Sequence, residues 1–139
     1  MTRMVSTVRR RVDPAPLTAV VAAGDLALVA LWVAVGQGFH GLPVLEYPSR
    51  YVLNVIPFLV GWTITSFVGG VYTRDAWQFP MRALSWTVPA WLLAVIIAVT
   101  LRGTPLFPGN ASVVFGLVSF GVGSALLLPW RVAVAVYDR

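Results

Sequence analysis

Four long apolar runs constrain this chain more than any other feature of its sequence. They cover about residues 17–36, 51–72, 83–101 and 111–130. Each is close to the roughly 20 helical residues that cross a hydrocarbon core of about 30 Å. The 139-residue chain is 58% hydrophobic and 11% charged, whereas an average soluble domain is about 25% charged. A soluble domain of this size has too little interior to bury so much apolar surface, so the runs are predicted to lie in a membrane.

The runs are predicted to be helices. A chain in lipid must satisfy every backbone hydrogen bond internally, and the alternating pattern of a closed barrel is missing. Segments rich in proline and glycine separate the runs and are expected to end the helices. The first run is longer than the apolar part of a signal peptide, which is about 7–15 residues. The sequence therefore predicts an all-α fold, an integral membrane bundle of four transmembrane helices in a single domain spanning residues 1–139.

The distribution of arginine predicts the orientation of the helices. With a cytoplasmic N-terminus, Arg50 and Arg102 lie outside and the other eight basic residues lie inside: Arg3, Arg9, Arg10, Arg11, Arg74, Arg82, Arg131 and Arg139. The positive-inside rule favours this arrangement, with both termini cytoplasmic in a multi-pass protein of the cell membrane. No basic face remains for nucleic acid once the apolar runs are set aside. The expected partners are the lipid bilayer and further copies of the chain or a larger membrane complex.

Asp25 is a carboxylate deep inside the first run. It lies eight residues past Leu17, about 12 Å below the predicted inner boundary. An ionised carboxylate at mid-membrane costs at least about 2.5–3.5 kcal/mol, so Asp25 should face the bundle and be hydrogen-bonded. Every arginine falls near a predicted boundary, so we expect no ion-pair partner and a neutral carboxyl. Thr65 and Ser119, at similar depth, are its predicted hydrogen-bond partners. Whether Asp25 fastens helices together or carries a proton stays open.

Two further groups of residues are candidates for specific roles. Small residues recur on one face of the second and fourth runs, and Gly61, Gly116 and Gly123 are predicted to be helix-packing positions. Polar residues collect on the predicted outer side: His40, Glu46, Arg50 and Arg102. His40 is either a pH-sensitive group that donates to Glu46 or an ordinary solvated loop residue.

The sequence offers little for catalysis. Cysteine is absent and there is one histidine, so disulfides and thiolate chemistry are excluded, and a metal or haem site is hard to build. No nucleophile–base pair, glycine-rich phosphate loop or pair of carboxylates is recognisable. We therefore expect a protein that is not an enzyme and has no cofactor and no metal.

Several short motifs, taken in order, resemble a known family of small four-span membrane proteins of unknown function found in halophilic archaea and actinobacteria. The matching segments are Asp25, GQGFHG (36–41), PFLVGW (57–62), LR (101–102) and WR (130–131). The loop before His40 departs from that family, which more often has basic and serine residues there. The resemblance implies the four-span architecture. It points to Asp25, His40, Trp62, Arg102 and Arg131 without giving them roles.

Three functions are compatible with these features. The first is a structural or accessory membrane component that acts as an oligomer or within a larger complex. The second is a proton-coupled transporter or channel that uses Asp25, by analogy with small multidrug transporters, which also place an acid in the first of four helices. The third is a membrane module that binds a lipid, quinone or pigment through Trp62, Trp91 and the aromatic residues at the helix ends.

Overall fold

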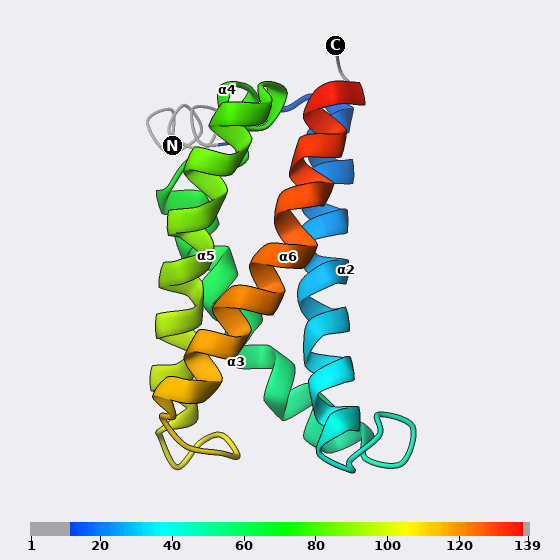
Figure 1. Ribbon diagram of the computed structural model, residues 1–139, viewed down its shortest axis with the longest axis vertical. Helices are drawn as coiled ribbons and strands as arrows, with labels where there is room; N and C mark the ends of the chain where they lie inside the picture. Colours follow the sequence, from blue (N-terminus) through cyan, green and yellow to red (C-terminus); the bar gives the residue numbers. More distant parts are fainter. Residues whose placement is uncertain (1–11, 138–139) are drawn as a thin grey trace, which may run out of the picture.

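The computed structural model describes residues 12–137 and is a bundle of four long helices (Figure 1). All four are long and apolar enough to cross a membrane: α2 (Pro16–Phe39), α3 (Pro48–Val68), α5 (Pro80–Arg102) and α6 (Val113–Tyr137). A short helix, α4 (Arg74–Gln78), precedes α5. Residues 12–137 contain no strand, only an isolated bridge between Val12 and Tyr72. The predicted all-α membrane bundle is confirmed. Of the arginines behind the predicted orientation, five lie outside the described residues: Arg3, Arg9, Arg10, Arg11 and Arg139.

Proline sets where three of the helices begin. Pro16, Pro48 and Pro80 each occupy the first turn of α2, α3 or α5. The first N–H groups of a helix have no hydrogen-bond partner within it, so proline, which lacks this N–H, costs nothing there. The fixed φ of proline also suits the start of a helix. Within the helices, Pro57, Pro89 and Pro129 are tolerated. Neighbouring helices and local adjustments can satisfy the carbonyls that such prolines free.

The last helix is longer than predicted. The fourth run was expected to end at Trp130, but α6 continues through Pro129 and on to Tyr137. As a result Arg131 lies inside a membrane-length helix, more than one turn before its end, and not at its boundary. This difference changes the interpretation of Asp25.

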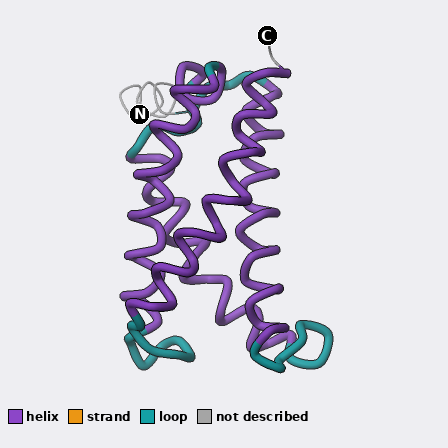
Figure 2. Tube along the Cα trace, viewed as in Figure 1, coloured by secondary structure: helices purple, strands orange, loops and turns teal. Residues whose placement is uncertain are grey.

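Helices α3 and α6 each pack against both α2 and α5. In Figure 1, α2 and α5 lie at the two sides, with α6 crossing in front and α3 behind. Helix α6 starts beside α5 and finishes beside α2 (Figure 1). The connections 40–47 and 103–112 lie together at one end of the bundle, the loop end, and α4 lies at the other, the α4 end (Figure 2).

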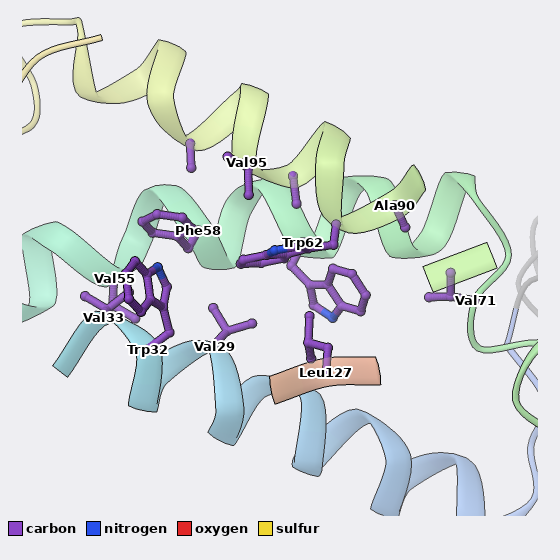
Figure 3. Packing of buried hydrophobic residues seen from close by; sticks show 13 residues of the cluster. Val29, Trp32, Val33, Val55, Phe58, Trp62, Val71, Ala90, Val95 and Leu127 are labelled. Atoms are coloured by element: carbon purple, nitrogen blue, oxygen red, sulfur yellow. The ribbon is translucent and has the colours of Figure 1, made fainter. Parts of the chain in front are cut away.

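Aromatic rings fill the centre of the bundle. Trp62 and Trp91 meet edge to face with their ring centroids 6.2 Å apart, and Phe58 stacks on Trp91 at 6.0 Å. Val29 and Leu127 approach Trp62 from α2 and α6 (Figure 3). The core thus joins all four long helices, and it separates the α4 end from the loop end.

Candidate functional site

Asp25 and Arg131 form an ion pair inside the bundle, between α2 and α6. Arg131 donates from Nη2 to Oδ2 of Asp25 at 2.6 Å and from Nε to Oδ1 at 3.1 Å. Both side chains are 0% exposed. A guanidinium that holds both carboxylate oxygens is the strongest geometry available to such a pair, since it adds directional hydrogen bonds to the charge attraction.

Further hydrogen bonds surround the pair. The Tyr72 hydroxyl donates to Oδ2 of Asp25 at 2.8 Å, and the Trp62 indole N–H donates to the Tyr72 hydroxyl at 2.9 Å. Nη1 of Arg131 donates to the Val71 carbonyl at 2.8 Å, and its guanidinium carbon lies 5.0 Å from the centre of the Tyr72 ring. One polar network therefore joins residues of α2, α3 and α6 with the turn that follows α3. We call it the Asp25 network, and it consists of Asp25, Trp62, Val71, Tyr72 and Arg131.

The turn after α3 is what brings Val71 and Tyr72 to this position. Gly70 has φ +66°, a left-handed conformation that glycine adopts without strain. The Val71 N–H then donates back to the Ser66 carbonyl at 3.1 Å, which folds the chain over the end of the helix. The sequence analysis placed Tyr72 at the end of the second run, residues 51–72. Its place in the structure is instead after α3, with its hydroxyl bonded inside the bundle.

The expected partners of Asp25 were wrong. We expected no arginine within reach and hydrogen bonds from Thr65 and Ser119. The carboxylate instead bonds to Arg131 and Tyr72, while the Thr65 and Ser119 hydroxyls are buried without a hydrogen-bond partner. The physical reason is the extra length of α6, which carries Arg131 into the bundle beside α2. The expectation of a neutral carboxyl rested on the cost of an ionised group at mid-membrane as well as on the missing arginine, and only the second of these arguments fails.

The polar residues expected on the outer side gather only in part. His40, Arg50 and Arg102 line a cavity of about 550 Å³ at the loop end, together with Gln37 and Asn54 from α2 and α3. Glu46 is exposed in the loop and does not line this cavity. Among the described side chains, residues 12–73 and 76–137, no ion pair involves Arg50 or Arg102. The sequence placed these residues at one end, but it gave no indication of a shared cavity.

Two amide side chains to which the sequence analysis gave no role at this end, Gln37 and Asn54, organise this cavity. Arg102 Nη1 donates to Oδ1 of Asn54 at 3.3 Å, and Nδ2 of Asn54 donates to Oε1 of Gln37 at 2.9 Å. Gln37 in turn donates to the Tyr47 carbonyl at 3.2 Å. The spacing of Gln37 and Asn54 on two different helices gives no sequence signal, because only the packing of α2 against α3 brings them together.

The three glycines assigned to helix packing lie between helices of this chain. Gly61 in α3 lies against the backbone of Ala94 in α5, so a side chain there would strike the Ala94 carbonyl. Gly123 in α6 lies under the Trp91 ring, and Gly116 faces Val99 and Val95 at ordinary contact distance. Gly61 and Gly123 let α5 approach α3 and α6 closely, which is the physical use of small residues in membrane bundles.

The proposed binding of a lipid, quinone or pigment through Trp62 and Trp91 gains no support. Among the side chains that the structure describes, those of residues 12–73 and 76–137, no three from His, Cys, Asp or Glu lie close enough to hold a metal ion. Trp62 and Trp91 were candidates for contact with a lipid, quinone or pigment. Both are enclosed in the core at 1% exposure, and neither lines the loop-end cavity.

These features define a class of protein: a four-helix membrane bundle with a buried carboxylate–guanidinium pair at its α4 end and a basic cavity at its loop end. The family model described as "Protein of unknown function (DUF3054)" matches residues 22–134, and the chain belongs to this family. The matched segment includes every residue of the Asp25 network and all residues that line the cavity. No curated protein and no solved structure matches the chain.

Proposed function

We propose that this protein is a non-enzymatic accessory component of the cell membrane that associates with further copies of itself, and that the Asp25–Arg131 pair fixes its fold. The enclosure of the pair is the observation that carries this proposal. Both oxygens of Asp25 already accept hydrogen bonds from donors, and both side chains are 0% exposed. A carrier group must exchange protons or substrate with water, and a group in this position has no such access.

The exposed side of α6 is the surface proposed for association. Gly121 and Ala125 are exposed, one turn apart, and a side chain added at Gly121 would meet no atom within 4 Å. Valines flank them on the same side, with Val118 and Val122 both exposed. Small residues four apart let two membrane helices approach closely, and this drives association in lipid, where burial of apolar surface does not.

A cross-linking experiment tests this surface directly. The chain has no cysteine, so single cysteines can be introduced without side reactions. Gly121→Cys should form disulfide-linked dimers in native membranes under mild oxidation, whereas Leu93→Cys, exposed at 52% on α5, is the matched control and should not. Equal cross-linking at both positions, or none at either, would reject association through α6.

Labelling of single introduced cysteines tests the proposed orientation. Of the described arginines, Arg50 and Arg102 lie at the loop end, and Arg131 belongs to the α4 half. With cytoplasmic termini, a cysteine at Leu106 in the 103–112 connection should react with an impermeant maleimide in intact cells. A cysteine at Met81, exposed at the start of α5, should react only after lysis. The reverse result would invert the topology.

Proton-coupled transport is the outcome that would overturn the structural role of Asp25. Purified protein in liposomes is expected to carry no proton flux down an imposed pH gradient, measured with an enclosed pH dye. Flux that is present in the wild type and abolished by Asp25→Asn in a correctly folded variant would establish a carrier role.

A further inference from the structure

The loop-end cavity has the charge of an anion site. Its lining includes His40, Arg50 and Arg102, and no acidic residue is among the lining side chains. Arg50 and Arg102 repel each other electrostatically. Two guanidinium groups that face one cavity without a carboxylate are favourable only if solvent or a bound anion compensates their charge.

Two residues that line the cavity, Trp32 and Arg102, carry buried hydrogen-bond donors that the protein does not use. Trp32 lines it, is 8% exposed, and its indole N–H is buried without an acceptor. Nε of Arg102 is likewise buried without a partner. The rest of the Arg102 side chain is held in place, since Nη1 bonds to Asn54 and the guanidinium lies 4.3 Å from the centre of the Phe115 ring. Buried donors in folded proteins are usually paired, so an acceptor that reached either group from the cavity would be stabilised there.

The remaining wall of the cavity is apolar and reaches the outside of the bundle. Phe58 and Val33 form its inner part, and Val114 and Val118 of α6 form its edge. Val114 is 70% exposed and Val118 is 47% exposed, on a helix that spans the membrane. The cavity is therefore basic on one side and continuous with a lipid-facing surface on the other. Its volume, about 550 Å³, is in the range of small-molecule sites.

From this combination we infer that the loop-end cavity binds the oxyanion head of an amphiphile. The anionic oxygens lie between Arg50 and Arg102 and accept from the free donors of Trp32 and Arg102, while the apolar chain leaves along Val114 and Val118. Arginine suits this role because its planar donors match the oxygens of a phosphate or a carboxylate. The inference goes beyond the proposed accessory role and concerns the opposite side of the core from the Asp25 network.

Binding of phosphatidylglycerol to the full chain in mild detergent tests the site. Native mass spectrometry over a lipid titration gives the dissociation constant for each protein variant. Phosphatidylglycerol should bind more tightly than phosphatidylcholine of the same chain length. Arg50→Gln and Arg102→Gln should each weaken phosphatidylglycerol binding about tenfold or more, as expected for loss of a charge-assisted hydrogen bond. Arg82→Gln, which removes an exposed arginine at the start of α5, is the matched control and should leave binding unchanged.

Two further measurements make the result decisive. Arg50 is exposed and holds no side-chain hydrogen bond in the bundle, so Arg50→Gln carries the test even if Arg102→Gln fails to fold. Inorganic phosphate titrated into the same protein separates a lipid from a soluble anion. Weak displacement of phosphatidylglycerol by phosphate supports an amphiphile. Any one of three results would overturn the inference. Inorganic phosphate binds as tightly as phosphatidylglycerol, phosphatidylglycerol and phosphatidylcholine bind equally well, or Arg50→Gln and Arg82→Gln weaken phosphatidylglycerol binding by the same factor.

Discussion

Removing both partners of the Asp25–Arg131 pair should destabilise the bundle far less than the two single removals do together. In Arg131→Met, the Asp25 carboxylate stays enclosed at 0% exposure without its cation. Breaking a buried pair in this way costs about 3–5 kcal/mol of unfolding free energy. Asp25→Leu should cost a similar amount, because the guanidinium is then left with only the Val71 carbonyl as a hydrogen-bond acceptor.

The double variant Asp25→Leu/Arg131→Met has no buried charge left. Two losses remain: the Val71 carbonyl loses the Arg131 donor, and the Tyr72 hydroxyl loses its acceptor. Each unpaired buried group costs about 1–3 kcal/mol. The Tyr72 hydroxyl still accepts from Trp62. We therefore expect the double variant to lose about 2–4 kcal/mol, well below the combined loss of the two single variants.

The measurement is a double-mutant cycle of unfolding free energies, by titration of mixed micelles with a denaturing detergent and circular dichroism as the signal. Arg82→Met, at an exposed position near the same end, is the control and should change stability by less than about 1 kcal/mol. The reasoning is refuted if the double variant loses as much as the two single variants together, or if Arg131→Met behaves like the control.

Three other outcomes follow from the same contacts. Tyr72→Phe should lose about 2–4 kcal/mol, because Asp25 loses one donor and the Trp62 N–H is left buried without an acceptor; stability equal to wild type in the same titration would contradict this. Gly123→Leu should prevent folding or lower the free energy of unfolding by more than about 3 kcal/mol, since the new side chain would collide with Trp91. Gly121→Leu is the control and should fold normally, because a side chain there meets open space. Similar folded yields of the two variants by size-exclusion chromatography would contradict the proposed packing. Infrared difference spectra of wild type against Asp25→Asn should show an ionised carboxylate at neutral pH, because the charged guanidinium of Arg131 donates to both of its oxygens. A protonated carboxyl band would support the sequence-based expectation of a neutral group.

Much of the architecture follows from the sequence for a simple reason. Solvation by lipid acts on each run separately, so a run of about 20 apolar residues predicts a membrane helix without knowledge of its neighbours. The prolines at residues 16, 48 and 80 likewise act locally, and the helices begin where those residues stand. The position of Asp25 inside a helix, facing the bundle, needed only depth and the cost of an exposed charge.

The partners in the two sites were decided by tertiary structure alone. Asp25 and Arg131 are 106 residues apart, and Asn54 and Arg102 are 48 apart, so no local pattern connects them. The sequence did not reveal that α6 continues past Pro129, because a proline with Trp130 and Arg131 directly after it also marks a membrane boundary. Only the packing of α6 against α2 shows that the arginine lies inside the bundle. The sequence determined that a buried carboxylate must be satisfied, and the fold determined which side chain satisfies it, because that choice depends on which helices become neighbours.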